Sequence, residues 1–271
     1  MKIGGRAIAR GGASILLISM SACGGSAQDR LDAVAENVDS IKSGVLDMRL
    51  SLTATSAPGE PIGFAISGPF GLGADGLEAD LTYQQIAGSA EAELRFIAVD
   101  GRAYVETEGS FYELPVEDDP PPAMAPTMLE DLGFSDWAVD PTVQDGDSDD
   151  EVTIVSRLDE VQAMEGLSLL LDDLEMKEAS GLAMLDGLDR ETVERSIEGG
   201  SMTVRIGADD LLRGLVVRMR FGVDPSSPLA EALEGVAGAE LLFSVKIAEP
   251  NRPVRVTPHE GALPLSELPA A

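Results

Sequence analysis

The sequence contains one histidine, His259, in the proline-containing stretch VTPHEG near its C-terminal end. A histidine acts as a general base only beside a nucleophile, and the motifs GxSxG, GxxxxGK[ST] and HExxH are absent from the sequence. Because turn-forming residues surround His259, we expect it at the surface. We therefore predict that the protein is not an enzyme and needs no cofactor. Serine-lysine and paired-carboxylate catalysis remain alternatives, since 48 acidic residues form many chance pairs.

The acidic stretch QDGDSDDE at residues 144–151 places carboxylates at alternate positions, as the calcium loop of an EF-hand does. The pattern then departs from that loop. Its sixth position is Asp150 instead of glycine, and its twelfth is Ser156 instead of a bidentate glutamate. We predict a solvated hairpin tip and no metal site, with weak cation binding as the alternative.

Cys23 is the only cysteine, so the chain cannot form an intramolecular disulfide. Before it come a basic segment with Lys2, Arg6 and Arg10 and a short apolar stretch, which is the layout of a secretory signal. The apolar stretch is shorter than the roughly 20 residues that cross a bilayer. The small residues 21–22 before Cys23 resemble the lipobox of bacterial lipoproteins, although Met20 stands where leucine is usual.

This pattern divides the chain into a signal peptide (1–22), a lipidated cysteine with a short linker (23–28) and one domain (29–271). We expect acyl chains on Cys23 to hold the protein at the extracytoplasmic face of the cell membrane. The alternative is an ordinary signal peptide followed by an incidental cysteine.

The formal net charge is −29, and it becomes about −32 when the three basic residues of the signal are removed. Such a chain repels phosphate, so we predict that it does not bind nucleic acid. Membrane contact must come from covalent lipid, because an acidic surface is not attracted to anionic headgroups. Most of the acidity has a simpler explanation in solubility.

Apolar periodicity predicts an α+β domain. Helical spacing over Asp29–Lys42 is followed from Val45 by strict alternation, and the Asp100-Gly101 pair predicts a tight hairpin. Helical period returns from Asp159, a candidate N-cap, and in short helices from Asp189 to a stop at Gly199 and from Ser227. The predicted strands span residues 45–54, 62–66, 77–83, 92–99, 102–107, 111–116, 137–143, 151–158, 202–206, 215–221 and 240–247.

The apolar side chains are mostly flexible and non-aromatic: aromatic residues are 4% of the chain, and there are ten methionines. Methionine and leucine surfaces adapt to irregular apolar partners. An ordinary filled core explains the same composition, and periodicity does not distinguish a filled core from a cavity.

The order of elements resembles the LppX/LprG-type lipoproteins of actinobacteria, which share the half-open barrel of the LolA and LolB carriers. The resemblance rests on the lipobox, on VDGRAYVETEGSFYELP, on VTIVSRLD entering a helix, on the hairpin SMTVRIGADDLLRGLVVRMRF and on the ending NRPVRVTPHEGALPLSEL. It implies a strongly curved antiparallel sheet, with helices covering the concave face and an apolar cavity that holds acyl chains.

The same resemblance implies an acyl lipid or lipoglycan as the partner, carried outside the cytoplasmic membrane. It supplies no catalytic residues, so cavity residues are proposed from strand and helix faces. They are Leu50, Leu52, Leu81, Tyr83, Leu94, Phe96, Leu170, Leu174, Val217 and Met219. The alternative is an interaction or sensor module of the cell envelope that uses the same fold without lipid transport.

Overall fold

The computed structural model describes residues 25–55, 61–73, 76–87, 93–107, 109–114, 129, 132–145, 151–173, 194–222, 237–259 and 261–267. Residues 1–22, Cys23 and Leu174 lie outside these ranges, as do the tip 146–150 and most of the helices predicted from Asp189 and Ser227.

The described elements are two helices, three short 3-10 helices and twelve strands. The helical elements are α1 (Ala27–Glu36), η1 (Val38–Ser40), η2 (Phe134–Trp137), α3 (Glu160–Asp173) and η4 (Leu265–Glu267). The strands are β1 (Ser43–Ala54), β2 (Ile62–Gly73), β3 (Gly76–Ala87), β4 (Glu93–Val99), β5 (Arg102–Thr107), β6 (Ser110–Leu114), β7 (Ala138–Asp145), β8 (Glu151–Leu158), β9 (Ile197–Gly207), β10 (Leu212–Gly222), β11 (Gly238–Ala248) and β12 (Leu263–Pro264).

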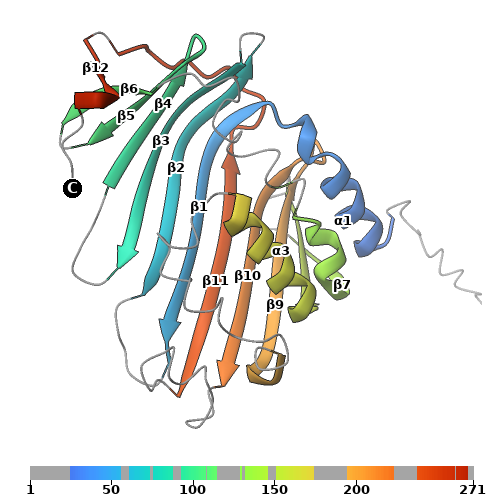
Figure 1. Ribbon diagram of the computed structural model, residues 1–271. Coiled ribbons are helices and arrows are strands. Elements are labelled where there is room, and N and C mark those ends of the chain that lie inside the picture. The colour runs from blue at the N-terminus through green and yellow to red at the C-terminus, as the bar shows by residue number, and fades with distance from the viewer. Residues whose placement is uncertain are drawn as a thin grey trace, which may run out of the picture.

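All twelve strands form one open, curved sheet in the order β12-β6-β5-β4-β3-β2-β1-β11-β10-β9-β8-β7 (Figure 1). Each described pairing is antiparallel except the short parallel pairing of β12 with β6. Two meanders, β1 to β6 and β7 to β11, meet where β1 pairs with β11. The predicted curved antiparallel sheet is confirmed.

Strand β1 illustrates why these residues form a sheet with one apolar face. Leu46, Met48 and Leu50 are buried, whereas the residues between them, Asp47 and Arg49, are exposed. Successive side chains of a strand point to opposite faces, so this alternation buries one face and exposes the other. We call the face that carries Leu50 the inner face and the opposite one the outer face.

The predicted Asp100-Gly101 hairpin is confirmed between β4 and β5. Both residues have positive φ, 52° and 69°, as the turns of two-residue hairpins require. The turn also fixes the register, so that Ala98 lies opposite Ala103.

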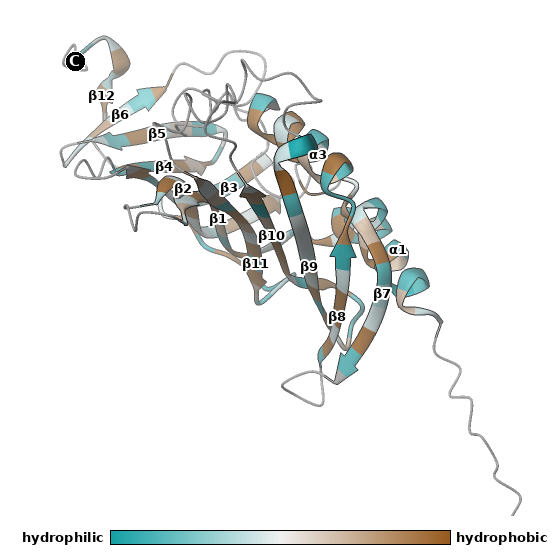
Figure 2. Cartoon of the chain, turned by 90° about the horizontal axis from the view of Figure 1, so that it is seen from below, coloured by the Kyte–Doolittle hydropathy of each residue, from teal (hydrophilic) through white to brown (hydrophobic). Residues whose placement is uncertain are grey.

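Strand β2 contains two glycines that allow a close approach of neighbouring backbones. A Cβ at Gly63 would lie 2.0 Å from the carbonyl oxygen of Leu50, and one at Gly68 would lie 2.0 Å from that of Asp80. Both glycines have positive φ, 147° and 142°. A glycine inside a strand commonly marks such a bend or close approach, and Figure 2 shows that the sheet to which β2 belongs is curved.

Helix α3 begins where the sequence predicts, whereas α1 begins at Ala27, two residues before the predicted start at Asp29, and ends earlier. Ser26 caps α1 in a capping box with Asp29, and Asp159 accepts a hydrogen bond from the backbone N–H of Gln162 at the start of α3 (3.1 Å). The helix predicted over Asp29–Lys42 stops at Glu36 and continues as the short η1.

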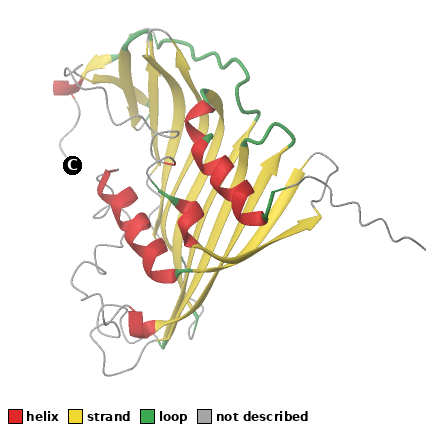
Figure 3. Cartoon of the chain, turned by 90° about the vertical axis from the view of Figure 1, so that its right-hand side faces the viewer, coloured by secondary structure: helices red, strands yellow, loops and turns green. Residues whose placement is uncertain are grey.

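Both helices lie on one side of the sheet (Figure 3). Helix α1 contacts β7 and η2, and α3 contacts η2 and β9. A Cβ at Gly166 of α3 would lie 2.4 Å from the Trp137 ring, so the glycine permits the close contact between α3 and η2. The described helix contacts thus concentrate at the β7–β9 end of the sheet.

One predicted helix end is wrong. Ile197, Gly199 and Gly200, which were expected to close a helix, belong to β9 and lie opposite Phe221, Arg220 and Met219 of β10. Gly200 suits this strand because a Cβ there would lie 2.8 Å from the side chain of Leu158 and 3.1 Å from that of Glu160. Pairing with β10 therefore outweighs the local stop signal.

The main hydrophobic core joins the inner face to α1, η2 and α3. It includes Leu31, Trp137 and Leu167 from the helical elements and the inner-face residues of β1, β2, β3, β8, β9, β10 and β11. A second, small cluster of Ile97, Val99 and Tyr104 lies elsewhere and packs against the C-terminal segment. Within the described residues, no helix is long and apolar enough to cross a membrane.

Candidate functional site

The inner face brings side chains from distant parts of the chain into continuous cross-strand rows. One row runs Leu94, Tyr83, Ile66, Met48, Val245, Leu215, Val204 and Ile154, from β4 to β8. Directly opposite residues in antiparallel strands share a face and lie about 5 Å apart between Cβ atoms. The row therefore forms an apolar surface that extends across most of the sheet.

Nine of the ten proposed cavity residues are described, and the structure brings them to this side of the sheet. Leu50, Leu52, Leu81, Tyr83, Leu94, Phe96, Val217 and Met219 share the inner face by register, and Leu170 belongs to α3. Leu50, Leu52, Leu81, Leu170, Val217 and Met219 are buried in the main core. Tyr83 and Phe96 are partly buried and pack against that core.

Burial decreases along the row toward β4. Met48 and Ile66 are both 2% exposed, Tyr83 is partly buried, and Leu94 is 39% exposed. An apolar side chain gains free energy when it leaves water, so the exposed part of Leu94 can still gain by contact with an apolar molecule. The row therefore has an open end at β4, and a second one at β7, where Val143 lies opposite Ile154 on the same face and is 49% exposed.

Tyr83 is the polar residue at this transition. Its ring stacks on that of Phe64, with a centroid distance of 6.2 Å and an interplanar angle of 29°. Its hydroxyl oxygen is buried and has no hydrogen-bond partner among the described residues. Burial raises the pKa of Tyr83 above its ordinary value, because the phenolate would lose its hydration. The hydroxyl is therefore a neutral donor and acceptor at neutral pH.

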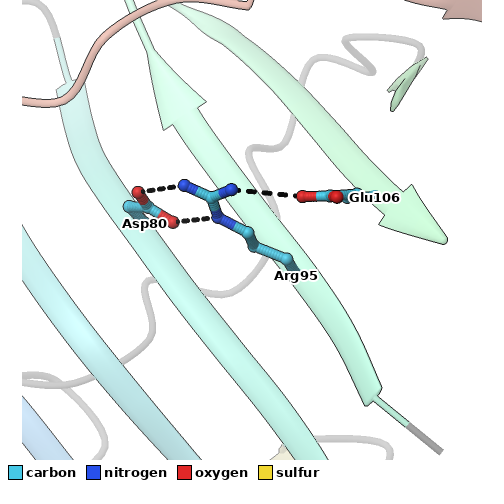
Figure 4. A network of polar contacts seen from close by, with 3 residues as sticks. All are labelled: Asp80, Arg95 and Glu106. Carbon is cyan, nitrogen blue, oxygen red and sulfur yellow. Dashed lines mark hydrogen bonds and ion pairs between the residues drawn. The ribbon is translucent and has the colours of Figure 1, made fainter. Parts of the chain in front are cut away.

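The outer face of the same strands carries a polar network (Figure 4). Arg95 donates through Nε and Nη2 to the two carboxylate oxygens of Asp80 (2.7 and 2.8 Å), and through Nη1 to Glu106 (3.2 Å). The hydrogen bond to Asp80 is the main reason that the pKa of Arg95 is raised further above its ordinary value. The network ties β3, β4 and β5 together and contains no nucleophile.

His259 stacks on Phe111 of β6, with ring centroids 3.6 Å apart, and is partly buried. The Arg95 guanidinium lies over the same Phe111 ring, 6.0 Å from its centroid. The surface position expected for His259 is therefore only partly correct, because the C-terminal segment folds back onto the outer face. Among the described residues, no group of three His, Cys, Asp or Glu side chains is placed to hold a metal ion.

A Gly-x-Gly-x-x-Gly sequence at Gly71, Gly73 and Gly76 is the pattern of dinucleotide-binding turns, but such a turn leads from a strand into a helix. Here β2 ends at Gly73 and β3 begins at Gly76, so the pattern joins two antiparallel strands. It has no helix N-terminus to bind a pyrophosphate.

The sequence interpretation did not anticipate the outer-face network or the orphaned Tyr83 hydroxyl. A charged residue at an outward position of a strand is ordinary, so Asp80, Arg95 and Glu106 carry no local signal of their contact. Their meeting depends on the register of β3, β4 and β5.

No protein-family model and no curated protein matches the sequence. Among solved structures, the chain is similar to LprF from Mycobacterium bovis, with 13% identity over 86% of this chain and 99% of that one, at a TM-score of 0.40. It is also similar to a LolA superfamily protein from Nitrosomonas europaea, with 10% identity over 86% of this chain and 96% of that one, at a TM-score of 0.22. Both are proteins of the kind that the sequence resemblance names.

Proposed function

We propose that the protein is a membrane-anchored lipoprotein that binds an acyl lipid or glycolipid on the inner face of its sheet and transfers it outside the cytoplasmic membrane. The observation that carries this proposal is the apolar inner face, whose side chains are buried in β1 but include an exposed one, Leu94 (39%), in β4.

Transfer of an acyl chain onto such a face needs no chemical energy source. Burying a chain of 16 carbons contributes on the order of 12 kcal/mol, at about 0.8 kcal/mol for each methylene. The same chain gains a comparable free energy in a bilayer. A carrier of this kind therefore exchanges lipid with a membrane according to concentration.

The lipobox at Cys23 supports a location at the membrane. Only three residues separate Cys23 from Ala27, where α1 begins, and even a fully extended linker of this length reaches roughly 13 Å. A lipidated Cys23 would hold the domain against the bilayer, where lipid is available for loading. Metabolic labelling with a radioactive fatty acid tests this: wild type incorporates the label, and Cys23→Ser does not.

The proposed lipid binding is tested by native mass spectrometry of the full chain purified from its own membranes. We expect a bound lipid mass and, in a vesicle-to-vesicle assay, transfer of a labelled acyl lipid. Leu94→Glu should slow transfer at least several-fold, because it places a charge at the β4 end of the inner face.

Val45→Glu is a matched control, because Val45 is an exposed apolar strand residue too (41%) but lies on the outer face of β1. It should leave transfer unchanged. Absence of both a lipid mass and transfer by wild type contradicts the proposal.

A second candidate, a protein-binding module, is favoured by the outer face of the central strands. Arg49, Arg218, Arg220 and Lys246 are exposed there, and they form no ion pair within the part of the chain that is described. In a chain of net charge −29, such a group of basic side chains suits an acidic protein surface.

Crosslinking in cells separates the two candidates. A reproducible protein partner that is lost in Arg218→Glu/Arg220→Glu, together with absence of lipid transfer, would favour the protein-binding module. Transfer that persists in this variant would favour the lipid carrier.

A further inference from the structure

The hydroxyl of Tyr83 is an unusual group for the surface on which it lies. Its cross-strand neighbours Ile66 and Leu94 are apolar, and the ring packs against Phe64. The oxygen is buried and has no hydrogen-bond partner in the part of the chain that the structure describes. Most buried hydroxyl groups in proteins have a partner, because a hydroxyl that leaves water without one loses hydrogen bonds that nothing replaces.

The position of this hydroxyl matches the transition between the closed and the open parts of the inner face. Ile66, on one side, is almost completely buried, and Leu94, on the other side, is exposed. The stack with Phe64 restricts the orientation of the Tyr83 ring, so the hydroxyl has a defined place on the surface. An acyl chain bound along this row would pass it.

We propose that the Tyr83 hydroxyl hydrogen-bonds a polar group of the bound molecule, so that the inner face takes an acyl lipid with an ester carbonyl beside its chain in preference to a plain hydrocarbon. This inference rests on the proposed lipid binding and adds the chemical class of the ligand. The hydroxyl donates its proton to the carbonyl oxygen, an acceptor that a hydrocarbon lacks.

A second buried hydroxyl without a partner provides a matched control. Ser156 on β8 also faces inward, opposite Met202, and no described residue hydrogen-bonds its Oγ. It lies six strand positions from Tyr83, about 29 Å along the sheet, at the end where the described helices make their contacts. If the protein simply tolerates a buried hydroxyl without a partner, removing either hydroxyl should leave the preference for an ester over a hydrocarbon unchanged.

The test uses the full chain carrying Cys23→Ser, stripped of lipid, and two single-chain probes of equal carbon number, methyl palmitate and heptadecane. We expect the ester to bind more tightly than the hydrocarbon. Tyr83→Phe should weaken methyl palmitate binding about fivefold and leave heptadecane binding unchanged, as for the loss of one neutral hydrogen bond. Ser156→Ala should leave the ratio of the two affinities unchanged.

Measuring the stability of the lipid-free protein separates a ligand contact from a structural role. If the hydroxyl serves the ligand, lipid-free Tyr83→Phe is at least as stable as wild type, because an unpaired buried hydroxyl has been removed. A clear loss of stability in that variant would overturn the inference, since it reveals a partner within the protein.

The remaining outcomes are also decisive. Equal affinities for the two probes in both wild type and Tyr83→Phe would overturn the inference while leaving lipid binding intact. Failure of either probe to bind wild type would overturn the inference together with the proposed function.

Discussion

Arg95 is the residue with the most extensive described set of polar contacts, and it is only partly exposed (41%). Arg95→Met would leave Asp80 and Glu106, which are less exposed, facing each other without a cation. We expect this change to lower the free energy of unfolding by about 1 kcal/mol, a value kept small because water screens part of the network. Urea denaturation at neutral pH measures it.

Arg102→Met is the control for Arg95. Its guanidinium is more exposed, and its Nε lies 4.0 Å from Glu113, at the limit of an ion pair. An exposed pair of this kind contributes little, so the change should alter the free energy of unfolding much less than Arg95→Met does. Equal effects of the two substitutions would contradict a special role for the Arg95 network.

The lowered pKa of Asp209 leads us to predict that the stability of the fold depends on pH. Burial alone would raise its pKa, but the hydrogen bonds and the charge of Arg213, at 2.7 and 2.8 Å, outweigh burial and bring the pKa below its ordinary value of 3.8. A carboxyl group whose pKa is lower in the folded state stabilises the fold above its ordinary pKa. This stabilisation is lost as the pH falls through the folded-state pKa.

We therefore expect Asp209→Asn to be less stable than wild type between pH 5 and about 7, and the difference to shrink below about pH 4. Denaturation curves at several pH values measure this difference. Asp210→Asn is the control, because the Asp210 side chain is exposed and asparagine tolerates the positive φ of 57°. A difference for Asp209→Asn that grows as the pH falls would contradict the assignment.

At the level of elements, the two glycines of β2 decide how closely the strands approach. Gly68→Ala would place a methyl group 2.0 Å from the backbone oxygen of Asp80, in a conformation with φ of 142° that disfavours any side chain. We expect a loss of about 2 kcal/mol or more in the free energy of unfolding, because backbone atoms must move. Thermal denaturation followed by circular dichroism measures it.

Gly71→Ala provides the comparison for Gly68 within the same strand. A Cβ there would meet its neighbours at ordinary contact distances of 3.7 Å or more, and Gly71 is not among the positive-φ residues. It should cost well under 1 kcal/mol. A loss as large as that of Gly68→Ala would mean that glycine is needed throughout this part of β2 for another reason.

The strands and their inner faces were predictable because apolar residues alternate with polar ones along the sequence, as Leu46, Met48 and Leu50 do in β1. The pairing of β1 with β11 was not predictable, since it joins segments about 200 residues apart and no local pattern encodes it. Ile197 and the glycines that follow it were misassigned for the same reason: contact with β10 determines their conformation.

The candidate site was predictable to a similar degree. The face of each proposed residue followed from alternation, so Leu81, Tyr83 and Leu94 were placed together correctly. How deeply each is buried depends on what covers the sheet, and the sequence does not specify that cover. The difference between buried Leu81 and exposed Leu94 therefore needed the structure.

For the whole molecule, the sheet is held by two unequal clusters. The main core covers the inner face from β1 to β3 and from β8 to β11, whereas the small cluster on the outer face of β4 and β5 packs against the C-terminal segment. Regions held by few buried apolar contacts open locally at lower free energy than the rest of a protein. The β5–β6–β12 end should therefore open before the central strands do.

Val256→Ala tests this difference, because Val256 packs against the small cluster and lies far in sequence from β5 and β6. Removing two methyl groups from a partly buried site costs about 1 kcal/mol. If the substitution lowers the free energy of local opening, amide hydrogen exchange of β5 and β6 accelerates about fivefold, while exchange in β10 and β11 stays unchanged. Val45→Ala, at an exposed position of β1, should change neither region. Uniform acceleration across both regions would mean that the sheet opens as one unit. The β5–β6–β12 end would then have no independent motion.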